Sequence, residues 1–133
     1  MKTITTLAAC IGFGLLAGSA VAQDTDIGAH LYADYCAACH GASGKGDGDM
    51  ANLMTIPAPN LTLLATNNDG EFPMLKVIHV IDGRTGLRGH GAPMPVFGRV
   101  FASDPGPANP YGSVLEVRGR VLSLAMYLES IQQ

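Results

Sequence analysis

Cys36-Ala37-Ala38-Cys39-His40 is the stretch of this sequence that decides its fold. Residues three apart lie on the same side of a helical turn. Both thiols of this stretch can therefore reach the two vinyl groups on one side of a porphyrin, and the next side chain can present an imidazole to the iron. The spacing is the signature of covalent haem attachment. We expect one haem c, bound through Cys36 and Cys39, with His40 as an iron ligand.

Three other kinds of site also use a Cys-x-x-Cys pair: a redox-active dithiol, half of a zinc site, and a small disulfide loop. A zinc site needs two more ligands, and the remaining histidines, His30, His79 and His90, show no paired spacing. A thioredoxin-like dithiol lies in a βαβ unit, which this sequence does not predict. The pattern therefore favours haem over these alternatives.

The N-terminus has the pattern of a secretory signal. Lys2 supplies a positive start, residues 7–17 form an apolar run, and Ala20-Val21-Ala22 offers small residues at a cleavage site. The run is too short to span a bilayer. We expect a signal peptide over residues 1–22 and one monohaem domain over residues 23–133, exported to the periplasm without a membrane span. An uncleaved N-terminal anchor is the alternative.

Cleavage after Ala22 would change both the charge and the cysteine count. Only Lys2 of the 8 basic residues would be lost and none of the 11 acidic ones, which leaves a formal charge of −4. No Lys/Arg cluster appears, so we expect no nucleic-acid partner. Cys10 would leave with the signal, so Cys36 and Cys39 would be the only cysteines. A mature chain this short has little apolar area to bury and often recruits a cofactor.

Hydrophobic periodicity predicts an all-α fold of helices and loops. The expected helices cover residues 27–39, capped by Asp26 and ended by Gly41, then a short turn at 61–65, an amphipathic helix at 72–83, and a last helix at 113–131. Residues 84–112, rich in Gly and Pro, are expected to form a loop.

Apolar side chains repeat at helical spacing in each of these segments. The repeating residues are Ile27, Leu31 and Tyr35 in the first; Leu75, Ile78 and either His79 or Ile81 in the amphipathic helix; and Val114, Val117, Val121, Leu124, Tyr127 and Leu128 in the last. We expect these faces to form the core.

The order of these features resembles the class I cytochrome c family over essentially the whole mature chain. The matching pieces are Gly28, Tyr32 and Cys36 to Gly41, then Gly44, Gly46 and Gly48, Pro59-Asn60-Leu61, Gly91-Ala92-Pro93-Met94-Pro95, and Tyr127 in the last helix. The resemblance implies a small cytochrome c fold, with helices and loops wrapped around one haem. It also implies that the carbonyl of Pro59 accepts a hydrogen bond from His40.

Met94 is the candidate for the sixth position of the iron. Prolines on both sides restrict its backbone, and the family's distal methionine lies in a similar Met-Pro context. Met74 and Met126 lie in expected helices, where methionine usually fills the core, and Met50 and Met54 have no rigid flanks. His90, in the same loop as Met94, is the competing ligand.

Arginines and a long loop surround this candidate ligand. Arg84, Arg88 and Arg99 could pair with a haem propionate or could be surface charges, and we take Arg84 as a cofactor-binding candidate. Residues 99–111 form an expected loop that either covers the distal side of the haem, forms a docking edge, or is a tolerated insertion.

A His/Met iron has no open position for a substrate, so we expect an electron carrier rather than an enzyme. Its partners would be an electron donor and an electron acceptor, and a charge of −4 favours basic or apolar docking surfaces on them. One alternative is a haem c subunit of a larger oxidoreductase complex. The other is a gas-binding haem protein, which requires a free sixth position.

Overall fold

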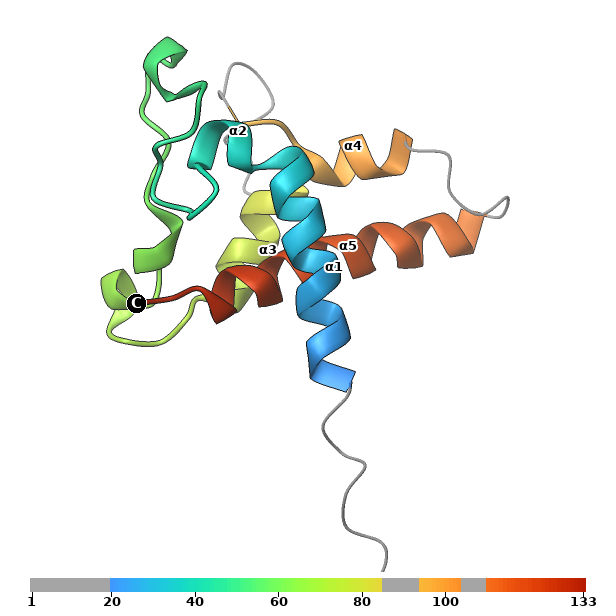
Figure 1. Ribbon diagram of the computed structural model, residues 1–133. Helices are drawn as coiled ribbons and strands as arrows, with labels where there is room; N and C mark the ends of the chain where they lie inside the picture. Colours follow the sequence, from blue (N-terminus) through green and yellow to red (C-terminus); the bar gives the residue numbers. More distant parts are fainter. Residues whose placement is uncertain (1–19, 85–93, 104–109) are drawn as a thin grey trace, which may run out of the picture.

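The computed structural model describes residues 20–84, 94–103 and 110–133 (Figure 1). These residues form helices and loops without a strand, which confirms the all-α prediction. The elements are α1 (Ala20–Tyr35), α2 (Ala37–His40), η1 (Ala51–Leu53), η2 (Leu61–Leu63), η3 (Thr66–Asn68), α3 (Met74–Asp82), α4 (Phe97–Ser103) and α5 (Pro110–Ser130), where η marks a 3-10 turn. Within the described ranges, no helix is both long enough and apolar enough to cross a membrane.

Helices α1 and α5 cross, and their contact is the most extensive between any two elements described (Figure 1). Gly28 of α1 lies at the crossing, where an added Cβ would stand 2.1 Å from the carbonyl oxygen of Ser123 and 2.7 Å from Cβ of Tyr127. Only glycine permits this approach. One turn further on, the ring of Tyr32 packs on that of Tyr127 with centroids 5.2 Å apart.

The first helix differs from the prediction at both ends. It begins at Ala20 rather than after Asp26, so Asp26 lies inside the helix, exposed, and is not its cap. Ala20, Ala22 and Gln23 are good helix formers, and with them the helix extends further toward the N-terminus. At the other end α1 stops at Tyr35, and the short α2 carries the chain to Gly41, whose φ of 80° ends the helix as expected.

Helix α3 (Met74–Asp82) matches the predicted segment, and two residues expected on its buried face, Ile78 and Ile81, lie in or against the core. Val77 and Ile81 belong to the core, with Met74 and Ile78 packed against it. Leu75, expected on the buried face, is 66% exposed. The buried residues keep helical spacing, so the helix was predicted correctly, and the expected face was wrong at Leu75.

Helix α4 lies inside the stretch that was expected to be a loop, so that prediction is wrong for residues 97–103. Phe97 and Phe101, four residues apart, are both buried. The ring of Tyr35 meets both edge-on, with centroids 6.1 Å and 5.2 Å away. Such aromatic pairs add stability beyond the area that they bury. These ring contacts, together with the packing of α4 on α5 and α3, explain a helix in a stretch rich in Gly and Pro.

Helix α5 contributes several of the buried side chains of the core. Val121, Leu124 and Leu128 are buried, which confirms the central part of the predicted stripe. Val114, also expected on the stripe, is 49% exposed. The N-terminal end of α5 extends beyond its crossing with α1 (Figure 1), and α4 also packs against α5.

Candidate functional site

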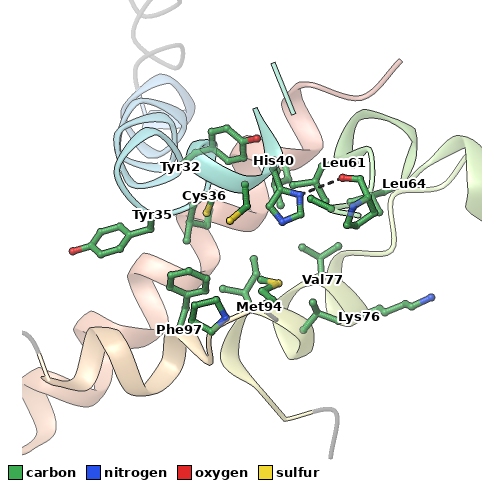
Figure 2. Close-up of a pocket in the computed structure, with 18 of the residues that line it drawn as sticks. Tyr32, Tyr35, Cys36, His40, Leu61, Leu64, Lys76, Val77, Met94 and Phe97 are labelled. Carbon is green, nitrogen blue, oxygen red and sulfur yellow. Dashed lines mark hydrogen bonds between the residues drawn. The ribbon is translucent and has the colours of Figure 1, made fainter. Parts of the chain in front are cut away.

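A cavity of about 300 Å³ lies between α2, α3, α5 and the segments around Pro59 and Met94 (Figure 2). Most of its wall is apolar. The lining residues are Tyr32, Tyr35, Cys36, Cys39, His40, Met54, Ile56, Pro57, Ala58, Pro59, Leu61, Leu64, Pro73, Lys76, Val77, Val80, Ile81, Met94, Pro95, Phe97, Leu124 and Leu128. A volume of this order is at the lower end of the range for cofactor sites.

One helical turn brings both cysteines to this cavity. The backbone N–H groups of Cys39 and His40 donate to the carbonyl of Cys36 at 3.1 Å and 2.9 Å, which closes the turn. Both thiols are free, so the disulfide alternative is wrong for this structure. Burial, and then the neighbouring Cys39, raises the pKa of Cys36 to about 12. Cys36 is therefore a neutral thiol rather than the thiolate that metal binding and redox exchange require.

His40 presents a neutral imidazole to the cavity. Its Nδ1 lies 3.2 Å from the carbonyl oxygen of Pro59, and because a carbonyl only accepts, Nδ1 is the donor. Burial lowers the pKa of His40, and the bond to Pro59 opposes this effect in part. Nε2 then keeps its lone pair, and Figure 2 shows it facing the cavity. This is the tautomer that a metal-ligating histidine requires.

The Pro59 carbonyl is held in place by the loops around it. Asn60 caps η2, since its side-chain oxygen accepts from N–H of Thr62 at 2.9 Å. The N–H of Leu61 donates to the carbonyl of Gly44 at 2.7 Å, which joins this segment to the glycine-rich loop after His40. The expected contact between His40 and Pro59 is thus present, and its position depends on both loops.

Tyr32 fixes the chain on the other side of His40. It is only 2% exposed, and its hydroxyl donates to the carbonyl of Gly41 at 2.7 Å. Burial is the main reason that the pKa of Tyr32 rises to about 12. The phenol is therefore a stable donor, which ties the turn after the candidate ligand to α1.

Met94 lies across the cavity from His40 (Figure 2). A second methionine, Met54, also lines the cavity, although its lack of rigid flanks had argued against it. Met74 packs against the core, and Met50 is 45% exposed. The structure thus brings two methionines to the cavity, and only the tertiary contacts distinguish Met54 from Met50.

None of the described arginine candidates lines the cavity, whereas one lysine does. Arg84 and Arg99 do not line the cavity, and the guanidinium of Arg84 pairs with Asp82. The remaining candidates, Arg88 and His90, are outside the described residues, and His30 and His79 do not line the cavity. Lys76 also lines the cavity, which the sequence did not predict. It lies two helical turns before Gly83, and no motif marks that position as part of a site.

The site has the composition that a covalent haem needs. Two thiols lie on one turn, a neutral imidazole and a thioether face each other, and apolar side chains line the space between them. The described residues contain no group of three or more His, Cys, Asp or Glu side chains that could hold a metal ion by themselves. An apolar wall suits a flat macrocycle, because burying its faces is favourable.

Comparison with known proteins gives one finding. The family model described as "Cytochrome c" matches residues 25–106, which is more than half of the chain and includes the cysteine pair, His40, Pro59 and Met94. No curated protein and no solved structure matches the chain.

Proposed function

Because the chain belongs to the cytochrome c family, we propose that it is an electron carrier with one haem c held by Cys36 and Cys39. In this proposal His40 and Met94 would be the two protein ligands of the iron. The observation that carries it is the placement of His40 and Met94 across one apolar cavity, next to two cysteines on a single turn. When bound, the haem supplies the reversible one-electron couple of its iron.

The residues of the cavity each have a part in this function. The hydrogen bond from His40 to Pro59 holds the imidazole in one orientation, so the ring need not move when the charge of the site changes. The thioether of Met94 favours a higher reduction potential than nitrogen or thiolate ligands. With both positions filled, no site remains for a substrate, which favours a carrier over an enzyme.

Export is part of the same proposal. We propose that residues 1–22 are removed and that residues 23–133 act in the periplasm with donor and acceptor proteins. Residues 1–19 lie outside the described structure, so the signal pattern supports this proposal. Covalent haem attachment takes place outside the cytoplasm, which agrees with an exported chain. Mass spectrometry of the periplasmic protein should give an N-terminus at Gln23, and recovery of the uncleaved chain from membranes would contradict export as a soluble carrier.

Ligation by Met94 can be tested with a matched pair of variants, since Met54 lines the same cavity. In the oxidised protein, Met94→Ala should abolish the sulfur–iron charge-transfer band at the red end of the spectrum, whereas Met54→Ala should keep it. The reverse result would make Met54 the ligand. Rapid binding of carbon monoxide by the native reduced protein would show an open sixth position and favour a gas-binding protein.

A further inference from the structure

We propose that Lys76 is a positioning residue for the haem, that its ammonium group pairs with a haem propionate, and that its charge raises the reduction potential. The inference rests on the proposed function, because it requires a haem in the cavity. It replaces Arg84, which the structure keeps away from the cavity and pairs with Asp82.

Among the described residues that line the cavity, Lys76 is the only one of the types Lys, Arg, Asp and Glu. No described residue of the wall is an Asp, Glu or Arg, and the other residue with a basic side chain is His40, the proposed iron ligand. In the described part of the chain, the amine of Lys76 forms no ion pair or hydrogen bond with the protein. Glu71 and His79 share a shallow groove with it on the outer side of α3, without a salt bridge to it. Lys76 is thus an available cation at the edge of an apolar cavity.

The cysteines set the direction of the haem relative to this lysine. In haem, the vinyl groups and the propionates occupy opposite halves of the macrocycle. Figure 2 shows Cys36 toward one end of the cavity and the amine of Lys76 beyond the other. Thioether bonds at the cysteine end therefore direct the propionates toward the end where Lys76 is found.

In the part of the chain that the structure describes, the lysine end of the cavity offers a propionate few other polar partners. The labelled neighbours there are Leu64 and Val77, which offer no polar side-chain atom (Figure 2). A carboxylate near apolar side chains loses part of its hydration and gains from a charged partner. Lys76 is exposed, so its amine can reach such a carboxylate at the mouth of the cavity without being buried itself.

The effect on the potential follows from charge. Oxidation adds one positive charge to the haem, and a nearby cation disfavours that state. We expect Lys76→Gln to reduce the equilibrium constant for haem reduction by roughly two- to fivefold, as for exposed ion pairs. At 59 mV per tenfold change for one electron, this is a decrease of about 20–40 mV. Lys76→Arg, which keeps the charge, should retain most of the native potential.

Lys45→Gln is the matched control, because Lys45 is an exposed lysine that does not line the cavity. Spectroelectrochemical titration of the haem-loaded proteins should give a clearly larger shift for Lys76→Gln than for Lys45→Gln. Redox-induced infrared difference spectra should show the propionate carboxylate band displaced in Lys76→Gln alone. Equal shifts in the two variants, or an unchanged carboxylate band, would overturn the pairing.

The first step of this experiment separates the two proposals. If the denatured wild-type protein shows no covalently bound haem, the proposed function fails and the role of Lys76 fails with it. If covalent haem is present and Lys76→Gln has the native potential, only the role of Lys76 is overturned and the electron carrier stands.

Discussion

At the residue scale, the phenol of Tyr32 shows how one hydrogen bond supports the site. Its hydroxyl donates to Gly41, the residue directly after His40, in a buried setting. Removing the hydroxyl takes away one of two hydrogen bonds to that carbonyl, which still accepts from the N–H of Gly44 at 3.1 Å. The loss is therefore that of one net hydrogen bond, about 0.5–1.5 kcal/mol. We expect Tyr32→Phe to lower the free energy of unfolding by this amount at neutral pH.

The same residue makes the stability depend on alkaline pH. The pKa of Tyr32 rises from 10.0 to about 12 in the folded protein, mainly through burial, so the folded state holds the proton more tightly than the unfolded state. This contribution is fully present below about pH 10 and is lost as the pH rises through about 12. The free energies of unfolding of haem-loaded wild type and Tyr32→Phe, measured with denaturant, should therefore become equal as the pH rises through that range. A constant difference between them up to about pH 12 would contradict the assignment.

At the scale of the elements, the crossing of α1 and α5 depends on one glycine. An added Cβ at Gly28 would overlap the backbone of Ser123, which cannot move aside as a flexible side chain could. We expect Gly28→Ala to push the helices apart and to destabilise the protein by about 1–3 kcal/mol, the usual effect of overpacking. Thermal unfolding of the haem-loaded protein measures this.

Gly119, in the same helix α5, provides the control. An added Cβ there meets no atom within 4 Å. Because alanine is the better residue in a helix, Gly119→Ala should stabilise the protein by about 0.5–1 kcal/mol. A Gly28→Ala variant that gains stability in the same way would show that the helices do not depend on this close approach.

At the scale of the whole molecule, the core is built around the cavity. Leu124 and Leu128 of α5 and Val77 and Ile81 of α3 belong both to the buried core and to the cavity wall. In a haem-free chain, a cavity of about 300 Å³ would leave these side chains without contacts on one side, which destabilises a core. The haem therefore serves as part of the core in the proposed function.

This predicts that covalent haem and folding are coupled. Replacing both Cys36 and Cys39 by Ala should remove the covalent haem and lower the helical content and the melting temperature measured by circular dichroism. The single variant Cys39→Ala, which keeps one thioether bond, should retain haem and most of the helix. A haem-free double variant with the native melting curve would show that the core forms without the cofactor.

The sequence by itself determined the chemistry of the site. Cys36, Cys39 and His40 lie within one helical turn, so their relative placement depends on local structure and not on contacts with distant segments. The segments of α3 and α5 were likewise predictable, because helical periodicity is a local property of the chain. Met94 as a ligand and the cleavage after Ala22 remain predictions.

Only the tertiary structure decided which side chains surround the cavity. Helix α4 forms where Gly and Pro predict a loop, because its aromatic side chains pack on Tyr35. Lys76 lines the cavity and Arg84 does not, although Lys76 lies within the expected helix 72–83 and Arg84 directly follows it. Both outcomes depend on contacts between segments that are distant along the chain. The free energy of those contacts cannot be predicted from the local sequence pattern.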